Sequence, residues 1–73
     1  MPTQEMRALW HPTRARILEL LKAEPATRSQ LVGAAGAPYA EVAYHCRALY
    51  RSGCIQYAES SGPEADDPLF EAV

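Results

Sequence analysis

The stretch from Gln30 to Cys46, QLVGAAGAPYAEVAYHC, decides the fold of this 73-residue chain. Its apolar residues at helical spacing are Leu31, Val32 and Ala35 before Gly36, and Val42 and Cys46 after it. Glycine enters the left-handed region of backbone space freely, so it turns a chain sharply without strain. The pattern therefore predicts a helix-turn-helix, with helices over about 28–35 and 38–52 and Thr27 as the cap of the first.

The second of these helices is predicted to have one buried and one outward face. Val42, Cys46, Leu49 and Tyr50 fall at i, i+4, i+7 and i+8 and predict the buried face. Alanines on the other face permit close approach, tyrosines offer a hydroxyl and a ring, and arginines reach phosphate or guanine. We expect this face to enter the major groove of DNA. The predicted DNA-contacting residues are Arg28, Pro38, Tyr39, Ala40, Ala43, Tyr44, Arg47 and Arg51.

Two further helices are predicted ahead of this unit. Pro12 opens a helix over 12–23, with a buried stripe of Ile17, Leu18 and Leu21 and with Arg14 in water. Residues 3–10 place three apolar side chains on one side of a short amphipathic helix. These are Met6, Leu9 and Trp10. They either cover the core or form a dimer contact, and the sequence leaves both open.

After Gly53 the spacing of the apolar residues changes from the helical period of 3.6 residues to the strand period of 2 residues. Ile55 and Tyr57 alternate with polar or small neighbours, residues 60–68 have turn composition, and residues 69–73 can return as a second strand. The predicted fold class is mainly α with a C-terminal β-hairpin: three to four helices plus a wing. A chain of this length has room for one domain, so residues 1–73 are taken as a single unit.

The charge is divided unevenly along the chain. The formal net charge is −2, yet residues 1–55 hold all seven Lys and Arg and only four acidic residues, whereas residues 56–73 hold five acidic residues and no basic one. A basic body with an acidic tail has local fields that the net charge hides, so nucleic acid stays a candidate partner.

Composition narrows the function classes. No apolar run reaches the roughly 20 residues of a membrane span, and no secretory signal is expected. Two cysteines are too few for a disulfide scaffold, which favours the cytoplasm. We find no nucleophile–base pair and no Gly-rich phosphate loop, so we expect no enzyme and no cofactor.

The histidines and cysteines favour a structural role. His45 is expected in the core, and Cys46 is expected as a small buried hydrophobe. The two are adjacent on a helix, so their side chains diverge, and no metal site is expected. A bridge from Cys46 to Cys54 is also disfavoured, because a helix puts the two Cα atoms on the order of 11 Å apart and a disulfide needs under about 7 Å.

Three segments that follow one another in the chain resemble the ArsR-like winged helix-turn-helix regulators. They are HPTRARILELL at 11–21, the glycine-containing turn at 33–38 and EVAYHCRALYRSGCI at 41–55. The resemblance implies a DNA-binding transcriptional regulator that is usually a dimer. It places Ala43, Tyr44 and Arg47 at recognition-helix positions, His45 at the helix-packing position, and residues 55–73 in the wing.

The chain departs from this family at three points. Ala43 stands where the family often has Ser, the wing is acidic instead of basic, and neither the cysteine-rich metal-sensing motif nor a C-terminal dimerisation helix is found. An alternative function follows from the acidic wing: the same fold could dock its hairpin onto a basic protein surface without binding DNA.

Overall fold

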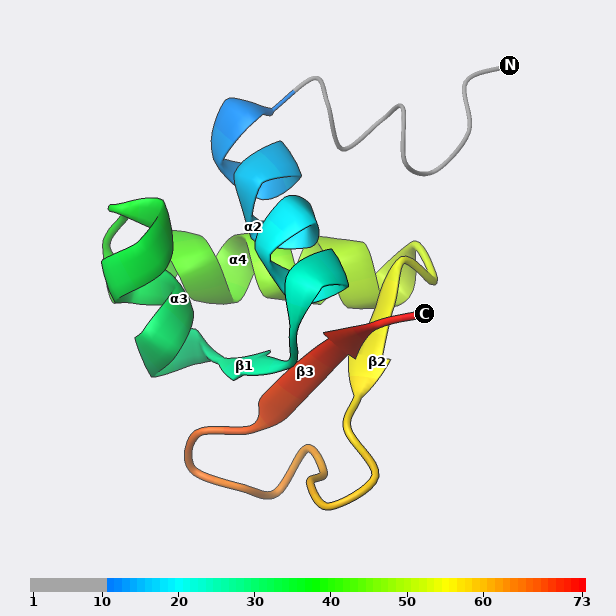
Figure 1. Cartoon of the computed structure of the whole chain (residues 1–73). Helices are drawn as coiled ribbons and strands as arrows, with labels where there is room; N and C mark the ends of the chain where they lie inside the picture. Colours follow the sequence, from blue (N-terminus) through cyan, green and yellow to red (C-terminus); the bar gives the residue numbers. More distant parts are fainter. Residues whose placement is uncertain (1–10) are drawn as a thin grey trace.

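The structure is a computed structural model, and it describes residues 11–73. Three helices and three short strands follow one another in the chain (Figure 1). In order they are α2 (Pro12–Ala23), β1 (Ala26–Thr27), α3 (Arg28–Ala35), α4 (Tyr39–Arg51), β2 (Ile55–Tyr57) and β3 (Leu69–Ala72). The helix expected over 3–10, with Met6, Leu9 and Trp10, lies outside the described residues.

Local chemistry sets the start of α2 and both ends of α3. Pro12 occupies the first turn of α2. Thr27 and Gln30 form a reciprocal capping box at the start of α3: the Thr27 hydroxyl accepts from the Gln30 amide at 3.2 Å, and the Gln30 side chain accepts from the Thr27 amide at 2.9 Å. Gly36 ends α3 in the left-handed region, at φ 68° and ψ 35°. Pro38 is the N-cap of α4 and not its first helical residue, so the predicted start was one residue early.

The predicted hairpin is present, but it belongs to a larger sheet. β2 and β3 pair antiparallel, and β1 adds to the other edge of β3, which gives the order β1-β3-β2. The sequence prediction missed β1 because a two-residue strand contains no alternation to detect. The hairpin strand also ends at Ala72, one residue earlier than predicted.

The core lies between the three helices and the sheet, and Figure 1 shows α2 crossing α4 with the sheet beside them. Its members are Ile17, Leu18, Leu21, Leu31, Val42, Cys46, Leu49, Ile55 and Phe70. The predicted stripe of α2 is therefore confirmed. Val32 and Ala35 are only half-buried, and Tyr50 was wrongly assigned to the core, since 46% of it is exposed. Tyr50 lies at the margin of the buried stripe of α4, about 100° around the helix from Leu49.

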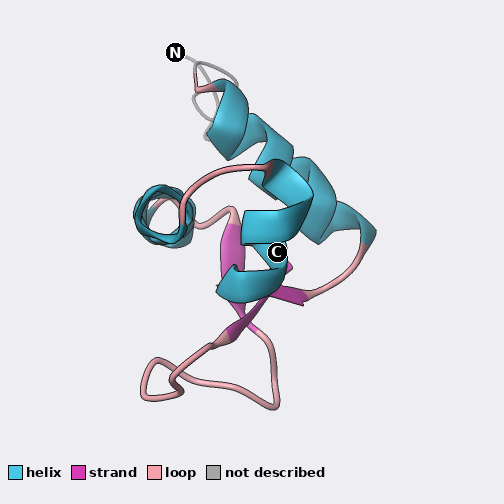
Figure 2. Ribbon diagram, turned by 90° about the vertical axis from the view of Figure 1, so that its left-hand side faces the viewer, coloured by secondary structure: helices cyan, strands magenta, loops and turns pink. Residues whose placement is uncertain are grey.

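The wing loop, residues 58–68, connects β2 to β3. Figure 2 views α4 end-on and shows this loop on the same side of the molecule as α4. Pro68 is fully buried, and the Ser61 hydroxyl accepts a hydrogen bond from the Leu69 amide at 3.0 Å. The Ala58 amide donates to the Leu69 carbonyl at 2.8 Å, which closes the base of the loop. No helix among residues 11–73 has the length and hydropathy to cross a membrane.

Candidate nucleic-acid interface

The outward face of α4 is open to solvent. Tyr39 is 44% exposed and Tyr44 is 61% exposed, and Arg47 is also exposed. The opposite face, with Val42 and Leu49, is buried against the core. Among the other residues predicted to contact DNA, Pro38, Ala40 and Arg51 are exposed, whereas Ala43 and Arg28 are half-buried. The expected exposure of Tyr39, Tyr44 and Arg47 beyond a bend at Gly36 is confirmed.

Each of the two tyrosines on this face lies under an arginine of another helix. The guanidinium carbon of Arg28, the first residue of α3, is 5.6 Å from the centre of the Tyr39 ring. The guanidinium carbon of Arg14, on α2, is 5.6 Å from the centre of the Tyr44 ring. Such cation–π contacts are worth about 0.5–1 kcal/mol at exposed sites. These contacts favour one orientation of each tyrosine ring. They also place both arginines beside the outward face of α4.

Below this face, His45 is buried and its two ring nitrogens have different partners. Arg14 Nε donates a hydrogen bond to His45 Nδ1 at 3.1 Å. Arg14 is half-buried, so the prediction that its side chain is surrounded by water was wrong. Because Nδ1 accepts, the neutral ring carries its proton on Nε2, which lies 3.6 Å from Glu41 Oε1. Burial and the charge of Arg14 lower the pKa of His45 and outweigh the opposing effect of Glu41. The predicted core role of His45 is confirmed.

Two hollows flank Arg47 on the surface. One, of about 230 Å³, lies between α4 and the wing; Arg28, Ala43, Tyr50 and Pro63 are among its lining residues. The other, of about 290 Å³, is lined by Tyr44, Arg47, Ala48 and Arg51. None of the residues lining either hollow is acidic. Arg47 therefore stands between two concave surfaces that both carry positive charge.

Arg28, one of the residues that line the first of these hollows, has a side-chain donor without a hydrogen-bond partner. Its Nε is buried and has no hydrogen-bond partner. A buried donor without a partner is destabilising, by about 1–3 kcal/mol and more where the group is charged. An anionic ligand oxygen is the acceptor that a guanidinium binds best.

The wing loop bears the opposite charge. Glu59, Glu64 and Asp66 are exposed on it. Asp67, in contrast, contacts α3, and its Oδ1 accepts a hydrogen bond from the Ser29 amide at 3.3 Å. The charge of Arg28, at the start of α3, helps to lower the pKa of Asp67, so this one wing carboxylate lies near an arginine of the helix-turn-helix.

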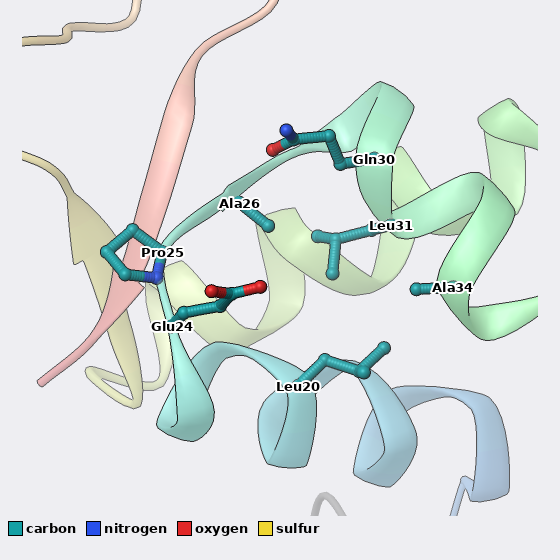
Figure 3. Close-up of a pocket in the computed structure, with 7 residues that line it drawn as sticks. All are labelled: Leu20, Glu24, Pro25, Ala26, Gln30, Leu31 and Ala34. Atoms are coloured by element: carbon teal, nitrogen blue, oxygen red, sulfur yellow. The ribbon is translucent and has the colours of Figure 1, made fainter.

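A separate cavity of about 270 Å³ lies between the end of α2, β1 and α3 (Figure 3). Leu20 of α2 faces Leu31 and Ala34 of α3 across it, and Glu24 is its one charged lining residue. No residue of α4 or of the wing lines this cavity. It is therefore distinct from the candidate interface.

Cys46 is buried and Cys54 is half-buried. Burial raises the pKa of the Cys46 thiol to about 11, against a small opposing effect of Arg28. No disulfide joins Cys46 to Cys54. Across residues 11–73, no group of three or more His, Cys, Asp or Glu side chains is placed to hold a metal ion.

Several solved structures share this fold. Rv0081 of M. tuberculosis matches 93% of this chain and 65% of its own at 22% identity, with a TM-score of 0.75. Reduced HlyU from Vibrio cholerae matches 90% of this chain and 65% of its own at 18% identity, with a TM-score of 0.74. Mb0332 from Mycobacterium bovis matches 94% of this chain and 60% of its own at 19% identity, with a TM-score of 0.74. It is described as a homodimeric winged helix-turn-helix DNA-binding domain and a possible ArsR-family transcriptional regulator.

The predicted fold is thereby confirmed: the chain has a winged helix-turn-helix fold, with α3 and α4 as the helix-turn-helix and the β2–β3 hairpin as the wing. It spans about two thirds of the length of HlyU and of Rv0081. No family model and no curated protein sequence matches it.

Sequence reasoning missed two features of the interface. It assigned no partner to Arg14, which pairs with His45 across 31 residues, and it treated Asp67 as one of several wing acids although it contacts Ser29. Neither contact left a signal in the sequence, because each joins residues that only the packing of distant elements brings together.

Proposed function

We propose that this chain is a DNA-binding transcriptional regulator that reads the major groove with α4. The observation that carries the proposal is the outward face of this helix, where Tyr44, Arg47 and Arg51 lie around a concave, non-acidic surface. The turn at Gly36 holds α4 against α3, so the helix is presented as a rigid element. An exposed, braced helix of this kind fits the width of the major groove.

The roles follow from position and chemistry. Arg47 and Arg51 contact backbone phosphates, and Ala40 and Ala43 let the helix approach the bases closely. Pro38 and Tyr39 lie at the entry of the helix into the groove. Tyr44 contributes its ring and hydroxyl to the contact. Arg28 begins α3, the helix that crosses the DNA backbone, and it lines the hollow between α4 and the wing.

The proposed regulator acts in the cytoplasm as a homodimer on a two-fold site. Mb0332, which has the same fold, is described as homodimeric. The candidate dimer contacts are Met6, Leu9 and Trp10, which precede the described residues. Sedimentation of the whole chain counts the subunits, and substitution of Trp10 by Ala tests the contact: we expect the dimer to weaken.

Fluorescence anisotropy tests the proposed function. A labelled random duplex is titrated with protein at about 50 mM and 200 mM salt, followed by duplexes from upstream genomic fragments. We expect binding that falls steeply with salt, and at least one fragment bound more tightly than the random duplex. Absence of binding to any duplex at the lower salt concentration contradicts the proposal.

A second candidate function is a protein-interaction module that uses the acidic wing. The observation in its favour is the exposure of Glu59, Glu64 and Asp66 on one loop. A partner would then need a basic surface. The same titration separates the two functions, because a module that only binds protein leaves the random duplex free at low salt.

A further inference from the structure

The sheet register brings the end of the wing loop to the start of α3. Thr27 pairs with Leu69 in the antiparallel β1–β3 ladder. Antiparallel chains run in opposite directions, so the residue two positions after Thr27 comes close to the residue two positions before Leu69. Ser29 on α3 and Asp67 on the wing loop therefore meet, although 38 residues separate them in sequence. This placement follows from the third strand, which no short-range pattern indicated.

Asp67 behaves as an anion bound at the N-terminus of α3. Its Oδ1 accepts from the Ser29 amide at 3.3 Å, where the first-turn amides of the helix point outward. Slight burial raises the pKa of Asp67, but hydrogen bonds from Ser29 and Thr27 and the charge of Arg28 outweigh it and lower the pKa. The carboxylate is therefore ionised at neutral pH. Buried Pro68 and the hydrogen bond from the Leu69 amide to Ser61 hold the adjoining chain in place.

The start of α3 is also where the proposed DNA complex needs a phosphate. The first helix of a helix-turn-helix crosses the DNA backbone, and amides at helix N-termini are common phosphate ligands. Arg28, the first residue of α3, adds a positive charge at this point, and that charge helps to lower the pKa of Asp67. The Nε of Arg28 is buried and unpartnered even with Asp67 nearby, so the wing carboxylate does not satisfy it.

We propose that Asp67 is an intramolecular competitor of the DNA backbone: it occupies the N-terminus of α3 in the free protein, and a phosphate displaces it when DNA binds. The proposal rests on the proposed DNA-binding function and adds a regulatory contact to it. Displacement moves a carboxylate away from the incoming phosphate and leaves the charge of Arg28 to that phosphate. The wing thus weakens binding to any duplex and raises the requirement for favourable base contacts.

The test compares Asp67→Asn with Asp66→Asn. Both remove one negative charge at adjacent positions of the wing, but Asp66 is exposed and only Asp67 contacts Ser29. Asparagine keeps an oxygen that can accept from the Ser29 amide, so the loop retains its shape. Anisotropy with a labelled random duplex at low salt measures both variants, and thermal melts verify that both are folded.

Asp66→Asn is expected to tighten binding slightly through the general charge effect. Asp67→Asn is expected to tighten it roughly two- to fivefold more, since an anion at an exposed helix N-terminus is worth about 0.3–1 kcal/mol. In the wild-type chain, the Ser29 amide resonance should shift on addition of duplex, as its acceptor changes from carboxylate to phosphate.

Equal affinities of the two variants, or weaker binding by Asp67→Asn, overturn the competitor role while leaving DNA binding intact. If neither variant nor the wild-type chain binds a duplex at low salt, the proposed function fails and the competitor role fails with it. The two failures are therefore distinguishable in one titration series.

Discussion

Arg14 Nε on α2 donates a 3.1 Å hydrogen bond to His45 Nδ1, which lies on α4 beneath the outward face of that helix. This bond fixes which ring nitrogen carries the proton and ties the start of α2 to the middle of α4. The same guanidinium lies 5.6 Å from the centre of the Tyr44 ring, so one arginine joins a buried histidine to an exposed tyrosine. Arg14 thus links α2 both to the buried side and to the exposed side of α4.

We predict that His45 makes the fold less stable in mild acid. Its pKa is lowered in the folded chain, because burial and Arg14 disfavour the imidazolium, whereas Glu41 opposes them and the neighbouring His11 adds to them. As pH falls below the ordinary value of 6.5, the unfolded chain takes up a proton that the folded chain does not. The free energy of unfolding then decreases, by at most about 1.4 kcal/mol per pH unit, until the folded pKa is reached.

The measurement is urea unfolding at several pH values between 5 and 7.5 for the wild-type chain and for His45→Asn. Asparagine does not titrate and keeps an oxygen acceptor for Arg14. The two proteins share every other ionisable side chain, so the difference between the two pH profiles isolates the His45 imidazole. Parallel profiles would contradict the prediction.

A pair of glycine substitutions tests the turn between α3 and α4. Gly36 has φ 68° and nothing within 4 Å of an added Cβ, so Gly36→Ala suffers only from its backbone conformation. We expect it to lower the free energy of unfolding by about 1–2 kcal/mol. Gly33 lies within α3, also with nothing within 4 Å, and Gly33→Ala should raise stability by about 0.5–1 kcal/mol.

An added methyl group is thus expected to lower the free energy of unfolding at position 36 and to raise it at position 33. Thermal melts measure both, and about 1 kcal/mol corresponds to a shift of roughly 4–8 °C for a domain of this size. A stabilising Gly36→Ala would show that the corner does not need the left-handed conformation.

The sequence was sufficient to predict the helices because their boundaries depend on local chemistry. Pro12, Thr27 and Gly36 each act within one turn of where they stand. The outward face of α4 was equally accessible, since helical periodicity separates Val42 and Leu49 from Arg47. Tyr50 was misassigned because it lies beside the buried stripe of α4. The centre of its ring is 4.9 Å from that of Tyr57, at the base of the wing, and about half of the residue is exposed.

The long-range contacts were out of reach for the same physical reason. β1 forms only because Ala26 pairs with Phe70 and Thr27 with Leu69, and two residues show no period of their own. The pairing of Arg14 with His45 and that of Ser29 with Asp67 depend on how the elements pack. A lone arginine or aspartate in a sequence is compatible with solvent as well as with such a partner.

The Cys46 thiol is predicted to be unreactive in the folded chain. Burial raises its pKa to about 11, so about one thiol in a thousand is ionised at pH 8, and its sulfur is shielded from solvent. In a Cys54→Ser variant, the remaining thiol should react with a disulfide reagent only as fast as the fold opens. The rate should rise with urea in parallel with unfolding. Rapid modification in buffer, with the fold intact by circular dichroism, would contradict the buried placement.

Arg47 is predicted to be the main electrostatic contact of α4, because it alone borders both hollows of the interface. Arg47→Ala should weaken binding to every duplex and make the dependence of log K on log salt shallower by about 0.9 per protomer, the effect of one lost phosphate contact. Lys22→Ala is the matched control: it removes the same charge from the last turn of α2, outside α4 and the wing. We expect its salt dependence to match that of the wild-type chain. If the two variants behave alike, the protein's overall charge governs binding and α4 has no special role. A shallower slope for Arg47→Ala alone would place a phosphate at the centre of the recognition helix.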